Sequence, residues 1–126
     1  MSAPRRLDFL RQIVNVALAE ADVSSKTTDI VRQLVSRAEL KYKFSVFGGD
    51  CTKLADYLSS REFDDVLKEL VHNGYYEVAE RILKKVIESY GDLESVRKAA
   101  EGALARAKRM REEHEKEKRE EAEERR

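Results

Sequence analysis

Residues 63–87, FDDVLKELVHNGYYEVAERILKKVI, contain two amphipathic helix patterns separated by the dipeptide Asn73-Gly74. Apolar residues recur at three- and four-residue steps on both sides of this dipeptide, the spacing that places them on one face of a helix. Glycine readily adopts the left-handed backbone conformation that commonly ends a helix, so we expect the first pattern to stop at Gly74. The stretch therefore predicts a helix, a tight turn and a second helix.

Apolar stripes with the same spacing run through four further segments, residues 7–18, 30–38, 51–58 and 93–107. We expect Thr27 or Thr28 to cap the second helix, Ser59 and Glu62 to form a capping box and Gly91 to close the fifth helix. The predicted fold class is all-α, with about six helices. They are arranged either as an antiparallel helix-hairpin bundle or as a short solenoid-like array, with a charged C-terminal helical extension.

Residues 41–47, KYKFSVF, are less clear, because polar and apolar residues alternate there as in a strand. No second convincing strand exists to pair with it. We therefore favour a helix end followed by an irregular hydrophobic connector.

The composition changes after Ala107. A chain of 126 residues suits one domain, which we place at residues 1–107. Residues 108–126 hold eight basic and eight acidic side chains, and only Met110 and Ala122 are apolar. Opposite charges four residues apart favour a helix, but no apolar seam is present for a coiled coil. These residues are expected to form a charged, solvent-exposed helical tail.

The overall charge and the cysteine content exclude several classes of partner. Basic and acidic residues number 25 each, so no long-range field favours nucleic acid or an acidic membrane. No apolar run approaches the roughly 20 residues of a membrane span. The single cysteine rules out an internal disulfide and suits a reducing compartment. We expect a cytoplasmic chain that binds neither nucleic acid nor a membrane.

Few residues offer chemistry. His72 and His114 are far apart in the sequence, and neither belongs to a His/Cys cluster with metal-ligand spacing. Cys51 begins a predicted helix, but the adjacent Asp50 opposes thiolate formation. Gly48-Gly49-Asp50 lacks the glycine spacing and the lysine of a phosphate-binding loop. We therefore expect no enzyme activity, no catalytic or metal-binding residues and no cofactor.

The helix pair has a family resemblance. Phe63, Val66 and Leu70, then Gly74 and Tyr76 at the turn, and Ala79, Leu83, Val86 and Ile87 resemble one tetratricopeptide repeat. The resemblance covers about a quarter of the chain and departs from the family at Leu67, where a small residue is usual. It implies a close-packed helix hairpin. The family binds peptides in a groove of stacked repeats, and one unit does not form that groove.

The chain as a whole also resembles a computationally designed helical protein assembled from native-like helical pieces, because glycines mark helix ends and surfaces are rich in Glu, Lys and Arg. We accordingly expect a monomeric structural scaffold without catalytic or ligand-binding activity that requires no partner. The alternative is a small natural protein–protein interaction module. Its partner surface would be the aromatic set Tyr42, Phe44, Phe47, Tyr75 and Tyr76.

Overall fold

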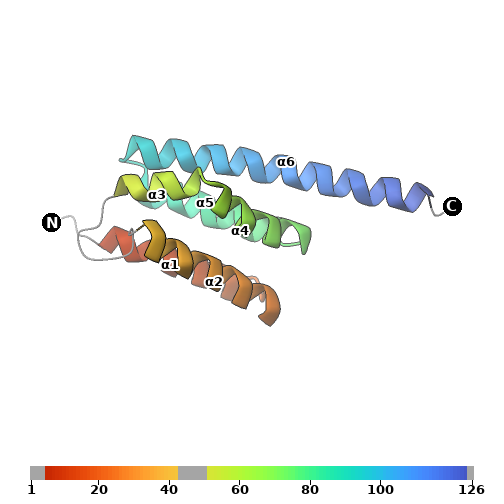
Figure 1. Ribbon diagram of the computed structural model, residues 1–126, viewed down its shortest axis with the longest axis horizontal. Helices are drawn as coiled ribbons and strands as arrows, with labels where there is room; N and C mark the ends of the chain where they lie inside the picture. Colours follow the sequence, from red (N-terminus) through yellow and green to blue (C-terminus); the bar gives the residue numbers. More distant parts are fainter. Residues whose placement is uncertain (1–4, 43–50, 125–126) are drawn as a thin grey trace.

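The computed structural model describes residues 5–42 and 51–124, and every regular element in these ranges is a helix. The six helices, in chain order, are α1 (Arg5–Glu20), α2 (Ser25–Tyr42), α3 (Cys51–Leu58), α4 (Arg61–His72), α5 (Tyr76–Tyr90) and α6 (Glu94–Glu124). Figure 1 shows that they lie nearly parallel to one long axis. The predicted all-α fold class is confirmed.

The helices form a bundle in which the pairs α1–α2, α4–α5 and α5–α6 are antiparallel, whereas α4 continues in the same direction as α3 (Figure 1). Helix α1 packs on α2 and α5, and α4 also packs on α2 and α5, so these four helices enclose a common core. Helix α6 lies on the other side of α4 and α5, and the short α3 packs mainly against α6. The α4–α5 hairpin is therefore the central layer, in contact with both the α1–α2 hairpin and α6.

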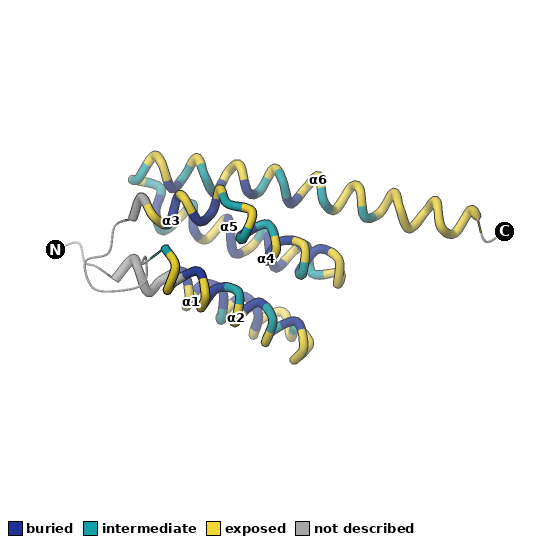
Figure 2. The backbone as a smooth tube through the Cα atoms, viewed as in Figure 1, coloured by how far each residue is buried: buried dark blue, intermediate teal, exposed yellow. Residues whose placement is uncertain are grey.

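Figure 2 shows the buried stripe of each helix facing this interior. The largest fully buried side chains come from all six helices except α2 and α6: Tyr57, Tyr90, Phe63, Leu10, Leu18, Leu54, Leu58, Leu67, Leu70, Ile82 and Leu83. Helix α6 instead contributes Val96 and three alanines, Ala100, Ala103 and Ala107, all completely buried. Small side chains let α6 approach the α4–α5 hairpin closely.

The turn at Gly74 forms as predicted. Gly74 has a φ of +86°, which an L side chain adopts only with strain. Its N–H donates to the Val71 carbonyl at 3.1 Å, and the Tyr75 N–H donates to the Leu70 carbonyl at 2.8 Å. This pair of bonds is the Schellman motif, which satisfies carbonyls at the end of α4. Helix α1 ends with the same pair of bonds, but there the left-handed residue is Asp22, with a φ of +52°.

Two predicted helix caps were wrong by one to four residues. Ser60, rather than Ser59, caps α4, since its Oγ accepts a hydrogen bond from the Phe63 N–H at 3.2 Å. Ser24, rather than Thr27 or Thr28, caps α2, because its Oγ accepts from the Thr27 N–H at 3.3 Å. Thr27 is buried inside the first turn. The fifth helix does end before Gly91, whose backbone is right-handed there.

A half-buried arginine joins α6 to the junction of α3 and α4. The Arg106 Nε donates to Asp64 Oδ1 at 2.7 Å, and its Nη2 donates to the Leu58 carbonyl at 2.7 Å. The side chains of Arg106 and Asp64 are 24% and 23% exposed. One guanidinium thus satisfies a carboxylate near the start of α4 and a carbonyl at the end of α3.

Contacts between α6 and the rest of the bundle continue past Ala107, the predicted end of the domain. Met110 packs against the core, Arg111 lies over the Tyr76 ring and His114 stacks on His72. Residues 115–124 are all exposed (Figure 2). We call residues 115–124 the arm. The compact part of α6 thus extends about two turns further than the sequence indicated.

Lys41 and Tyr42 form the end of α2, which agrees with the predicted helix end. The remainder of the ambiguous stretch, residues 43–47, lies outside the described residues. None of the described helices combines the length and apolar character that a membrane span needs.

Candidate functional site

A groove with a volume of about 520 Å³ lies between α1 and α5. Ile13 and Ala17 are buried at its base, while Val16, on the exposed face of α1, is 54% exposed. The remaining lining is polar, with Gln12, Asn15 and Glu20 from α1, and Arg81 and Lys85 from α5. An apolar base with a polar rim is the usual form of a binding groove.

The rim of this groove carries both signs of charge. Arg81 Nη1 lies 3.4 Å from Glu20 Oε1 and so joins α5 to α1. Lys85 Nζ lies 3.2 Å from Glu88 Oε1 on its own helix. All four side chains are more than half exposed, and exposed ion pairs of this kind contribute little to stability. The rim can therefore exchange these pairs for contacts with a bound molecule at small cost.

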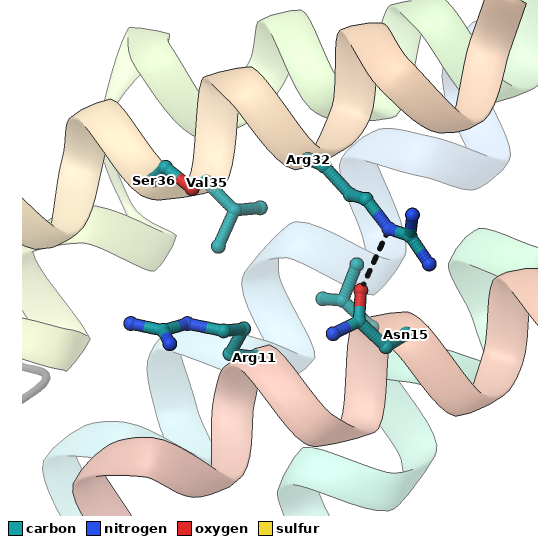
Figure 3. A pocket seen from close by; sticks show the side chains of 6 residues that line it. Arg11, Asn15, Arg32, Val35 and Ser36 are labelled. Carbon is teal, nitrogen blue, oxygen red and sulfur yellow. Dashed lines mark hydrogen bonds between the residues drawn. The ribbon is translucent and has the colours of Figure 1, made fainter.

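A smaller recess of about 90 Å³ lies between α1 and α2 (Figure 3). Asn15 Oδ1 accepts a hydrogen bond from Arg32 Nε at 3.0 Å across it. The Arg11 and Arg32 guanidinium groups lie toward opposite ends of the recess, so they do not converge on one point (Figure 3). It is well below the roughly 300–1,000 Å³ of an ordinary ligand pocket.

The first member of the aromatic set, Tyr42, takes part in a contact between α2 and α4. Its hydroxyl donates to Glu62 Oε1 at 2.8 Å, and Lys41 Nζ lies 2.9 Å from the same oxygen. The hydrogen bond from Lys41, with a further contribution from that of Tyr42, lowers the pKa of the Glu62 carboxyl. The Tyr42 ring packs against the buried Tyr57, with ring centroids 5.5 Å apart.

Tyr75 and Tyr76 lie at the other end of α4. The Tyr75 hydroxyl accepts a hydrogen bond from the Ser24 N–H at 3.1 Å. Tyr76 is only 6% exposed, and the Arg111 guanidinium carbon lies 4.1 Å from its ring centroid. Burial is the main cause that raises the pKa of the Tyr76 hydroxyl. The structure thus separates Tyr42 from Tyr75 and Tyr76, and Phe44 and Phe47 lie outside the described residues.

The two histidines, far apart in the sequence, lie together in the structure. The ring centroids of His72 and His114 are 4.9 Å apart, and the ring planes meet at 23°. Their separation along the chain gave no indication of this contact. The contact follows from the parallel packing of α4 and α6, which pairs residues 42 positions apart, as it also does for Asp64 and Arg106.

The sequence contains no signal for this contact. Each histidine is isolated in the sequence, and which helices pack together could not be predicted. The described residues contain no group of three or more His, Cys, Asp or Glu side chains arranged to hold a metal ion. The Cys51 side chain is outside the described part of the structure.

Comparison of the chain with protein-family models, with curated proteins and with solved structures finds no match.

Proposed function

We propose that this protein is a structural scaffold, a helical body that holds the C-terminal part of α6 as a stiff arm. The observation that supports it is the continuity of α6, a single helix of 31 residues. Before the arm begins, three side chains of this helix contact the α3–α4–α5 part of the body: Arg106, Arg111 and His114.

The arm is expected to stay helical because its first turn is already formed. Starting a helix is the unfavourable step, whereas extending one costs little for good helix formers such as Glu, Lys and Arg. Arg111 Nε and Glu115 Oε1, four residues apart, lie 3.9 Å from each other at the start of the arm. Each such pair contributes only a few tenths of a kcal/mol, so fraying is expected at the far end.

Distance measurements between spin labels test the stiffness of the arm. Lys68→Cys on α4 and Glu120→Cys on the arm carry the labels, in a chain whose native cysteine is replaced by Cys51→Ser. A single narrow distance distribution is expected. The matched control pairs Lys68→Cys with Arg109→Cys, on the anchored part of α6. An arm distribution as broad as that of a flexible chain, beside a narrow control, would contradict the proposal.

The resemblance to a designed protein carries its own expectation for this scaffold. Idealised helical designs are typically hyperstable, with unfolding midpoints above about 90 °C. The helical signal in circular dichroism should then persist to that temperature. A cooperative transition at about 45–65 °C is ordinary for natural domains and would argue against a designed origin. The likeness of residues 63–87 to a tetratricopeptide unit stays a prediction.

A protein–protein interaction module is the second candidate function, and the α1–α5 groove favours it. Its apolar base and exposed Val16 suit the apolar face of an amphipathic helix. Val16→Asp should abolish binding without unfolding the chain, since this side chain is half exposed. Ala19→Asp, exposed on α1 but outside the groove, is the control. The unaltered chain and the two variants are each immobilised and exposed to a cell lysate. If all three retain the same proteins in equal amounts, the groove is not the binding site.

A further inference from the structure

The His72–His114 pair lies where α6 leaves the body of the protein. His72 is the last residue of α4 and is exposed, whereas His114 is half-buried on α6. These are the only histidines in the chain. Any binding that depends on imidazole must therefore involve one or both of these side chains.

The Nε2 atom of His114 is the second relevant observation. It is shielded from solvent and has no hydrogen-bond partner among the described residues. A buried nitrogen left in this condition loses its hydration without compensation, which costs about 1–3 kcal/mol. A metal ion or a hydrogen-bond donor bound to this nitrogen would remove that cost, and the exposed imidazole of His72 stacks on the same ring.

The separation of the two rings suits a shared metal ion. Zinc binds imidazole nitrogen at about 2.0–2.1 Å, so two imidazoles at neighbouring corners of one tetrahedral ion have centroids roughly 5 Å apart. The observed separation is 4.9 Å. The ring planes face each other rather than a common point, so one ring must turn about its Cβ–Cγ bond. His72 has the space to do so because it is exposed.

Charges of both signs lie near the two rings, and few of the described side chains are available to complete a coordination shell. The Glu69 carboxylate, one turn before His72, accepts a hydrogen bond from Asn73 Nδ2 at 3.0 Å. Arg111, one turn before His114, adds a positive charge over Tyr76. No third side chain of metal-binding type is in place within the described residues. Water must complete the coordination, so the site would be weaker than a four-ligand structural zinc site.

We propose that His72 and His114 form a two-histidine site for a divalent transition-metal ion of the zinc type, which links the end of α4 to α6. Binding requires both neutral imidazoles to be close together, a condition met in the folded chain and not in the unfolded one. The ion therefore stabilises the fold. It requires only that the two rings lie together, so it does not depend on the stiffness of the arm.

Titration of the full, untagged chain with zinc chloride tests this site by calorimetry and by nuclear magnetic resonance. One ion per chain should bind more tightly than about 1 mM. The Cε1–H resonances of both histidines should shift together and saturate at one equivalent. At an ion concentration about 100-fold above its Kd, the thermal midpoint should rise by roughly 5–10 °C.

Single substitutions assign the ligands. His72→Gln and His114→Gln should each lower the affinity by at least about tenfold. The controls are Glu117→Gln, one turn after His114 on the arm, and Cys51→Ser, and both should bind as the unaltered chain does. Absence of binding at about 1 mM, or an affinity unchanged by His114→Gln, would overturn the proposal. Loss of binding in Glu117→Gln or Cys51→Ser equal to that in the histidine variants would also overturn it.

Discussion

Replacement of Arg106 by methionine should lower the free energy of unfolding by about 2–3 kcal/mol. Methionine retains most of the aliphatic volume of arginine, so the change removes mainly the two hydrogen bonds. Asp64 Oδ1 and the Leu58 carbonyl each lose a donor that lies at 2.7 Å. Hydrogen bonds to charged groups contribute about 1.5–3 kcal/mol, and a shielded acceptor left without its donor adds about 1 kcal/mol. Partial exposure of both side chains keeps the sum at the lower end.

A double-mutant cycle separates the ion pair from the carbonyl contact. Asp64→Asn removes the charge of the partner, and the pair Arg106→Met with Asp64→Asn completes the cycle. A coupling of about 1–2 kcal/mol is expected for a charge-assisted bond of this geometry. Arg106→Lys should lower the free energy of unfolding by less than Arg106→Met does. It should still lower it, because one ammonium group cannot make both of the hydrogen bonds that the guanidinium makes.

Urea denaturation followed by circular dichroism gives the unfolding free energy of each variant. Arg109→Met is the matched control, since Arg109 is an exposed arginine on the same helix and should change stability by less than about 0.5 kcal/mol. If Arg106→Met is no more destabilising than Arg109→Met, the contact does not contribute to stability, and α6 must be held by its other contacts with the body.

Three further predictions concern the backbone and the pH dependence of stability. Asp22→Gly should stabilise the protein by about 0.5–1 kcal/mol in urea denaturation, because Asp22 has a φ of +52°, and an unchanged or lower midpoint would contradict this. Gly74→Ala should destabilise the protein by about 1 kcal/mol, because Gly74 has the same left-handed backbone conformation. Gly102→Ala in α6 should stabilise it by about as much, since the added Cβ would meet nothing closer than Arg106 Nη1 at 3.8 Å. Equal effects of the two substitutions on the unfolding free energy would refute this distinction. The pKa of Glu62 is lowered from 4.5 by its contact with Lys41, so the stabilisation is present above that value and disappears as the pH falls through the folded-state pKa. Between about pH 5 and about pH 3 the wild type should therefore lose more stability than Glu62→Gln, and parallel losses would show that the contact has no effect.

The helices and the central turn were predictable because they depend on local signals. The three- and four-residue spacing of apolar side chains identified α1 to α6, and Gly74 marked the turn because few other residues adopt its conformation. The caps were less predictable. Ser59 and Ser60 are chemically equivalent neighbours, and their roles are decided by where α3 ends rather than by the capping pattern itself.

Contacts between helices could not be obtained in this way. The stacking of His72 on His114 depends on the register of α4 against α6, which is set by the burial of Ala100, Ala103 and Ala107 along α6. Periodicity identifies the face of a helix that is buried, but not the helix that covers it. The same difficulty explains why the aromatic residues Tyr42 and Tyr76 were grouped, although they belong to opposite ends of α4.

The unbroken course of α6 has a geometric consequence for everything that lies beyond its last anchor. An α-helix turns about 100° and advances 1.5 Å with each residue. The direction in which each arm side chain points is therefore fixed relative to the body by its distance in residues from His114. Insertion of one residue just after His114 would rotate the whole arm by about 100°, whereas insertion of eleven would return it to almost the original direction, roughly 16 Å further out. The body thus determines the direction in which each arm side chain points as well as its position.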